Sequence, residues 1–459
     1  MTDRMGRRDA CALAAWCALM ALATHSVVRY RWWIVVGYVA VAVVVVGLAW
    51  TARDDRGPGS GPRAGGWVPS AALALVGLVN LAVPAFSYLD ESGQLLVRIV
   101  LGVSCLVVAG LLLPGRGASR ALALAAALAG AAATAVLVVL GDPAPRIDVW
   151  VILQQSADAM AEGESIYART WVGSPGIADA FAYLPWTAVL SAPGRWLAGD
   201  VRWALAVLVL LSAVLVAAVG RWRRPALAAA ALLLLAPGSG TLVEQAWTEP
   251  TVLVGLAGWA LLVRGGRAWW AVVPLAVALA SKQHVVALLP LLAVWPRFGW
   301  RRTVVAAGGA GLLVAPWVLA GVGDFWHDTV TTMLDLPPLV FADTLYTLVL
   351  NETGVRLPVL VVGVVVLGVL GAAVVALRRR PVGLAGLLTW CAAVLLVANL
   401  VNKQAFYNQF WLVGALLLLA VAASSGAVSP APAPGQRERR SRPAGRSAVA
   451  PAPPTPSAD

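Results

Sequence analysis

Long apolar runs recur along almost the whole chain, and they constrain its fold more than any other feature. Each run is about 20 residues long, which is the length that an α-helix needs to cross the hydrocarbon core of a bilayer. The 459 residues are 60% hydrophobic and 12% charged, whereas a soluble domain carries about 25% charged residues. This composition excludes a water-soluble globular fold and a disordered chain. We predict an all-α, polytopic integral membrane protein of about 12–15 transmembrane helices.

The apolar runs in the first part of the chain each predict one helix. They fall near residues 10–28, 32–50, 67–89, 93–113 and 119–141. The first run follows a basic start and has the small residues of a signal-peptide cleavage site at 21–23. A second run follows almost at once, so we expect the first run to be retained as a helix.

The basic residues predict which side of the membrane each connector faces. The chain has 34 Lys and Arg against 22 Asp and Glu, and only Lys282 and Lys403 are lysines. Cytoplasmic loops are enriched in basic residues, so we interpret the excess as loop orientation and expect no nucleic-acid partner. This rule predicts a multi-pass plasma-membrane protein with both termini in the cytoplasm. Loops 142–181 and 323–343 would then lie outside.

The middle of the chain does not give a consistent number of crossings. Seven apolar stretches lie between the two outside loops, near residues 183–198, 203–220, 225–243, 250–264, 268–281, 283–296 and 303–322. An odd number of spans cannot join two loops on the same side. One stretch must be re-entrant, or two must be halves of one broken helix. Stretch 183–198 is short, and so are 268–281 and 283–296; the sequence does not decide between them.

The remaining features bound the domain organisation and the cofactors. Residues 426–459 are rich in Pro, Ala and Arg, which predicts a disordered cytoplasmic tail. The four cysteines lie inside apolar runs without a CxxC pair, which is typical of small buried side chains. The loop acids form no tight carboxylate cluster, and no nucleotide-binding motif appears. We therefore expect no metal and no cofactor.

Asp148 is the first candidate functional residue, because it follows a span directly in loop 142–181. Apolar and polar residues alternate at helical spacing over 148–162, which predicts a helix along the membrane surface. A carboxylate there faces the interface where a lipid head group lies. The alternative is that Asp148 only caps this helix. Asp158 and Glu162 are second choices, since one of them would face the same cavity.

An ordered set of short motifs in the chain resembles one protein family. Asp148 and its interfacial helix come first, followed by Gly163, Tyr167 and Tyr183-Leu184-Pro185. Later come Ser281-Lys282-Gln283-His284 and an apolar run that ends in Trp295-Pro296-Arg297. In this order the motifs resemble the polyprenol-phosphate-sugar-dependent glycosyltransferases of the GT-C fold. The greatest likeness is to the actinobacterial mannosyltransferases of glycosyltransferase family 87, over about residues 120–420.

The resemblance implies a GT-C-like core at 119–425 with extracytoplasmic loop helices, preceded by extra helices at 1–118. It implies transfer of a sugar, mannose in that family, from a polyprenyl-phosphate donor to a glycolipid or glycan acceptor. The donor is a co-substrate, and the lipid bilayer is the other partner. Asp148 matches the family's general base, which takes the proton of the acceptor hydroxyl. The extra N-terminal spans depart from the family pattern and leave the acceptor open.

Both lysines precede a glutamine at the edge of a span, in a chain that otherwise uses arginine. A leaving phosphate needs positive charge and N–H donors nearby, so Lys282 and Lys403 are its candidate partners. The alternative is that both ammonium groups snorkel to lipid head groups.

Several other polar residues beside the spans are candidates for sugar or phosphate contact. Gln245 and Glu249 would contact sugar hydroxyls or merely cap the next helix. Residues 406–411 form either an aromatic belt or a carbohydrate-stacking surface. The candidate substrate-binding residues are Lys282, Lys403, Tyr183, Glu249, Gln245, His327, His284, Gln404 and Asn408.

Two other functions compete with glycosyl transfer. A transporter or flippase would carry paired charges in mid-span and an internal repeat, and the two halves show no such repeat. A non-catalytic envelope assembly protein would need neither Asp148 nor the lysines. Convergence of Asp148, Lys282 and Lys403 on one outer cavity would favour the enzyme.

Overall fold

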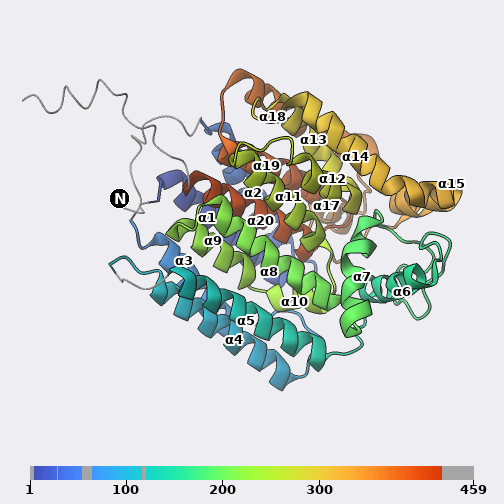
Figure 1. Ribbon diagram of the computed structural model, residues 1–459, viewed down its shortest axis with the longest axis horizontal. Coiled ribbons are helices and arrows are strands. Elements are labelled where there is room, and N and C mark those ends of the chain that lie inside the picture. The colour runs from blue at the N-terminus through green and yellow to red at the C-terminus, as the bar shows by residue number, and fades with distance from the viewer. Residues whose placement is uncertain (1–4, 28, 54–64, 116–119, 426–459) are drawn as a thin grey trace, which may run out of the picture.

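The computed structural model describes residues 5–27, 29–53, 65–115 and 120–425 (Figure 1). The predicted disordered tail at 426–459 lies outside these residues. The described chain is all-α, and eight of its helices are long and apolar enough to cross a membrane. The polytopic helical class is therefore confirmed. Four further apolar helices have only 10–17 residues, so the number of 12–15 transmembrane helices stays a prediction.

The helices follow the apolar runs closely. The first five are α1 (Arg7–His25), α2 (Trp32–Trp50), α3 (Val68–Ala82), α4 (Glu91–Leu111) and α5 (Arg120–Gly141). The middle of the chain forms α6 (Asp148–Glu162), α7 (Trp186–Ala198), α8 (Arg202–Val219), α9 (Arg224–Leu234), α10 (Ser239–Glu244), α11 (Glu249–Arg264), α12 (Val272–Ser281), η1 (Gln283–Leu288) and α13 (Leu289–Val294). The last elements are α14 (Gly299–Ala320), α15 (Val322–Trp326), η2 (His327–Thr331), α16 (Thr332–Asp335), α17 (Leu345–Thr353), α18 (Val359–Arg379), α19 (Leu384–Val401) and α20 (Tyr407–Ser425).

The bundle is built around α19 and α20, which are its most deeply buried long helices. α1 and α2 pack against them, and the Tyr38 ring of α2 stacks on Phe410 of α20 with centroids 4.0 Å apart. A second apolar cluster joins α6 and α7 to the segment before α7 and to the start of α8; it includes Ile152, Leu153, Tyr167, Phe181 and Ala192. This cluster holds α6 and α7 together on the right of the bundle in Figure 1.

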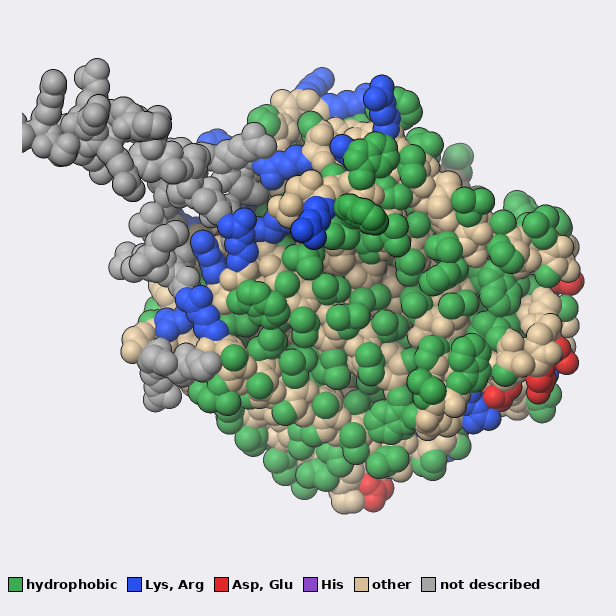
Figure 2. Space-filling model, viewed as in Figure 1, with side chains coloured by type: hydrophobic (Ala, Val, Ile, Leu, Met, Phe, Trp, Pro, Cys, Tyr) green, Lys and Arg blue, Asp and Glu red, His purple; other side chains and the backbone are tan. Residues whose placement is uncertain are grey.

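Polar contacts between distant residues identify the two ends of the bundle. At one end, side chains donate to backbone carbonyls of distant helix termini: Arg380 to Trp50, Trp295 to Val382, and Arg223 to Ser425. We call this the arginine end. We call the opposite end, which carries residues 142–185 and 321–358, the loop end. Figure 2 shows Lys and Arg gathered on the upper left, whereas Asp and Glu lie at the right and lower edges.

α7 explains the odd number of apolar stretches in the middle of the chain. Near its start, the Thr187 hydroxyl donates to the Ser281 carbonyl at 2.6 Å. Just after its end, the Gly199 carbonyl accepts from the Gln154 amide of α6 at 3.2 Å. Both contacts lie at the loop end, so α7 does not pass from one end to the other. The remaining stretches are even in number, and both long loops therefore reach the same end.

Two apolar segments are interrupted close to the loop end. α9 and α10 are separated by residues 235–238, where Gly238 takes the left-handed φ of 82°. The Tyr407 hydroxyl donates to the Pro237 carbonyl in this break at 2.6 Å. α12 ends at Lys282, whose φ of −144° and ψ of 137° are extended. Breaks of this kind are tolerated in a membrane protein where other groups satisfy the freed backbone.

Asp343 at the loop end gives the fold a pH-dependent contact. Burial raises the pKa of its carboxyl to about 7, although the Arg31 N–H donates to Oδ1 at 2.7 Å. An unfolded aspartate titrates near pH 4, so the folded chain binds this proton more tightly. The free energy of unfolding therefore falls as the pH rises from about 4 to 7.

We predict that Asp343→Asn removes this loss, because the amide keeps an acceptor for Arg31 and carries no charge. At pH 8 the variant should be more stable than the wild type by on the order of 1–4 kcal/mol, and at pH 4 the two should be similar. Thermal unfolding in detergent between pH 4 and 8 measures the difference. If the stability of both proteins depended on pH in the same way, Asp343 would not be the group responsible.

Candidate functional site

A buried ion pair joins Lys282 to Glu249. Nζ of Lys282 lies 2.5 Å from Oε1 of Glu249, and the two side chains are 7% and 0% exposed. Lys282 stands at the break between α12 and η1, and Glu249 is the first residue of α11. The Asn408 side-chain amide in the first turn of α20 donates to the same Oε1 at 2.8 Å. Three of the predicted site residues are thus in direct contact.

The Tyr183 ring lies against this ion pair. The Lys282 ammonium lies 5.3 Å from the centroid of the Tyr183 ring, within cation–π distance. Burial, and then the charges of Asp148 and Glu249, raise the pKa of the Tyr183 phenol. The Tyr183 carbonyl accepts from the Tyr167 hydroxyl at 2.8 Å, which fixes the backbone here. Tyr183 therefore lies in the field of both carboxylates and against the lysine.

Asp148 holds the segment that leads to Tyr183. Asp148 is the first residue of α6, and Ile147 occupies the N-cap position that was the alternative role of Asp148. Its Oδ1 accepts from the Val149 N–H at 2.8 Å, and its Oδ2 accepts from the Ile177 N–H at 3.3 Å. A Cβ on Gly176 would lie 2.4 Å from Oδ2, so glycine permits the close approach.

The second long loop contacts the same segment through Asp328. This carboxylate is 2% exposed and accepts from the Phe181 N–H at 2.7 Å. Nδ1 of the exposed His327 ring lies 3.0 Å from Asp328 Oδ1, and this hydrogen bond raises the His327 pKa. Gln283 donates to the Ala182 carbonyl at 3.2 Å. Sequence reasoning named His327 but missed Asp328, whose only signal was its position in an acidic loop without arginine.

The turn between α10 and α11 contains several buried polar atoms without a partner among the described residues. They are Nε2 of Gln245, Oγ1 of Thr248 and Oε2 of Glu249. Ala246 has a φ of 52°, a left-handed conformation that is uncommon for a residue other than glycine. Strained backbone of this kind clusters at binding sites, so this turn is the best candidate for contacting a polar ligand.

Lys403 and Gln404 lie at the loop end but make a different contact. The Lys403 ammonium donates to the carbonyls of Leu334, at 2.7 Å, and Leu336. The Gln404 amide donates to the Pro337 carbonyl at 2.8 Å. These bonds hold the segment after α16, and no described contact joins Lys403 to Lys282. A phosphate contact by Lys403 stays a prediction.

The other candidates lie at the edge of this arrangement. His284 is exposed in η1, one residue beyond Gln283. Asp158 forms a bidentate ion pair with Arg195, with contacts of 2.8 and 3.1 Å. Glu162 lies 3.8 Å from Arg169 on the exposed side of α6. Neither second-choice acid makes a described contact with Tyr183 or Lys282.

The chain matches no protein-family model and no curated protein sequence. Among the residues that the structure describes, no group of three or more His, Cys, Asp or Glu side chains has the arrangement to hold a metal ion. The functional assignment therefore depends on the side chains that meet around Tyr183.

We predict that Glu249 and Lys282 stabilise the fold as a coupled pair. Removing either partner leaves a buried unpaired group, so Lys282→Met and Glu249→Gln should each lower the free energy of unfolding by about 3–5 kcal/mol. The double variant should lose less than the sum of the two. Denaturant unfolding in detergent measures these losses, with the partly exposed Lys403→Met as the control. Additive losses would show that the pair is not coupled.

Proposed function

We propose that the protein is an integral membrane glycosyltransferase that uses a polyprenyl-phosphate sugar, with mannose as the first sugar to test. The observation that carries the proposal is the Lys282 ammonium 5.3 Å from the Tyr183 ring, at the end of a segment whose Ile177 N–H donates to Asp148 at 3.3 Å. A partly exposed carboxylate and a buried ammonium thus flank one short segment at the loop end. Transfer from a lipid phosphate needs both groups.

In this proposal Asp148 is the general base. Its carboxylate takes the proton of the acceptor hydroxyl while the acceptor oxygen attacks the anomeric carbon. The bond from that carbon to the phosphate oxygen breaks, and its electron pair leaves with the phosphate. The acceptor is a glycolipid or glycan of the envelope.

Lys282 stabilises the leaving phosphate. One face of its ammonium is engaged by Glu249, which leaves N–H donors for phosphate oxygens. The unpaired atoms of Gln245, Thr248 and Glu249 are buried, so sugar hydroxyls would reach them only after the turn between α10 and α11 opens. These groups sit at the break of α12 and at the start of α11, where neighbouring helices shield them from water.

The charge division between the two ends supports an orientation for this reaction. Basic residues mark the cytoplasmic side, so we assign the arginine end to the cytoplasm. Both termini then face the cytoplasm, and Asp148 and Lys282 face the extracytoplasmic leaflet.

We predict that Asp148→Asn lowers the transfer rate by about 10²–10⁴-fold, the usual contribution of a general base. The amide retains an acceptor for the Ile177 N–H, so the protein should fold. The assay is transfer of radiolabelled mannose from synthetic polyprenyl-phosphate mannose to membrane acceptors. Asp158→Asn, on the same helix, is the matched control and should retain activity. Full activity of Asp148→Asn would rule out Asp148 as the general base.

We predict that Lys282→Arg impairs transfer. A planar guanidinium is bulkier than an ammonium and does not fit the same contacts with Glu249 and the Tyr183 ring. Donor-dependent kinetics should show a lower kcat or a raised KM for the donor. Lys403→Arg is the comparison, because Lys403 is already bound to loop carbonyls. Unchanged kinetics at position 282 would support lipid snorkelling.

A transporter is the second candidate, and the helix breaks favour it. Discontinuous helices that meet a buried charged pair are typical of secondary transporters, and the break after α12 places Lys282 against Glu249 in this way. Purified protein in vesicles separates the two functions. Translocation of a lipid phosphate without sugar transfer would favour the transporter.

A further inference from the structure

A second buried ion pair lies where the segment that carries Asp148 joins the bundle. Arg202, at the start of α8, is fully buried, and its Nη2 lies 2.7 Å from Oδ2 of Asp200. Its Nε lies 3.0 Å from both carboxylate oxygens. Such bidentate contact fixes the orientation of the two groups as well as their distance. None of the residues singled out in the sequence belongs to this pair.

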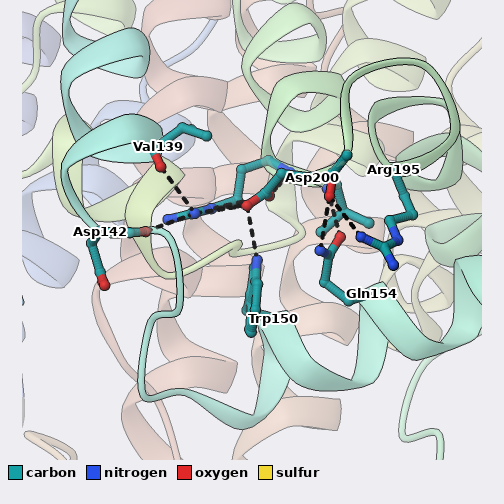
Figure 3. A network of polar contacts seen from close by, with 9 residues as sticks. Val139, Asp142, Trp150, Gln154, Arg195 and Asp200 are labelled. Carbon is teal, nitrogen blue, oxygen red and sulfur yellow. Dashed lines mark hydrogen bonds and ion pairs between the residues drawn. The ribbon is translucent and has the colours of Figure 1, made fainter.

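The Asp200–Arg202 pair contacts residues that come before and after Asp148 in the sequence. Before it, Nη2 of Arg202 donates to the carbonyl of Val139 in the last turn of α5, at 3.3 Å, and to that of Asp142 just after the helix, at 2.8 Å. After it, the Trp150 indole N–H donates to Oδ2 of Asp200 at 3.2 Å. Figure 3 shows the Trp150 indole pointing from α6 toward the Asp200 carboxylate.

Gln154 attaches α6 to the same turn a second time. Its amide donates to the Gly199 carbonyl at 3.2 Å, and its Oε1 accepts from the Val201 N–H at 2.9 Å. Trp150 and Gln154 are four residues apart, so they share one face of α6. The turn between α7 and α8 therefore holds α6 at two points, Trp150 and Gln154. These two contacts fix both the position of the first turn of α6 and the direction of its axis.

We infer that Asp200, Arg202 and Trp150 are positioning residues that set the Asp148 carboxylate relative to Tyr183. Asp148 lies on the short stretch between Asp142 and Trp150, and one ion pair holds both ends of that stretch. The inference rests on the proposed role of Asp148 as the base. A shift of about 1 Å in a reacting group is enough to slow catalysis by up to about 10²-fold.

Trp150→Phe tests the inference, because it removes the indole N–H and keeps an aromatic ring. We expect kcat for transfer to fall about 10-fold or more, while KM for the polyprenyl-phosphate donor and the Tm stay near the wild-type values. Trp196→Phe is the matched control. Its indole also donates to α6, at the Ala157 carbonyl at 2.9 Å, but farther along the helix from Asp148. This variant should keep the wild-type kcat.

The double variant with Asp148→Asn separates positioning from a structural role. A residue that acts through Asp148 adds no further loss once the carboxylate is gone, so Trp150→Phe should not slow Asp148→Asn any further. Amide hydrogen exchange at 147–151 should also be faster in Trp150→Phe than in Trp196→Phe.

Three results would overturn the inference: a wild-type kcat in Trp150→Phe, multiplicative losses in the double variant, or unchanged exchange at 147–151. Full activity of Asp148→Asn would instead overturn the proposed function. The exchange measurement needs no transfer activity, so the two failures are distinguishable.

Discussion

A lysine inside an apolar helical bundle remains charged only where a carboxylate lies against it, and Glu249 supplies that carboxylate 2.5 Å from Lys282. The pair requires α12 to stop at Lys282 and α11 to begin at Glu249. It also draws in Asn408 from α20 and the ring of Tyr183. The helix break at Lys282 and the buried charges thus belong to one interaction, and the Tyr183 ring packs against it.

The ion pair of Asp200 and Arg202 lies at the same end of the bundle but makes different contacts from the pair of Glu249 and Lys282. It joins α5, α6 and α8 through backbone carbonyls and the Trp150 indole. The carboxylate of Asp200 is bound by Arg202 and Trp150 within the protein. The loop end therefore carries two buried ion pairs; in our proposal the pair of Glu249 and Lys282 binds the ligand and the pair of Asp200 and Arg202 positions Asp148.

Apolar periodicity was enough to predict the helical class and most helix positions, because each span must satisfy its own backbone in lipid. α6 begins and ends where its spacing predicts, at 148 and 162. Sequence alone did not reveal that α7 stays at one end, because that depends on contacts with Ser281 and Gln154 from distant helices. Arg202 and Asp328 were missed for the same reason, because Arg202 donates to the carbonyls of Val139 and Asp142 and Asp328 accepts from the Phe181 N–H, all far away in the chain.

In our proposal a lipid phosphate binds beside Lys282 and Tyr183 at the loop end. Photo-crosslinking tests this with a polyprenyl phosphate that carries a diazirine in the isoprene unit next to the phosphate. We expect mass spectrometry to find the label in residues 177–185 and 282–285, and we expect Lys282→Met to reduce it. Label confined to the arginine end, or unchanged by Lys282→Met, would contradict the proposal.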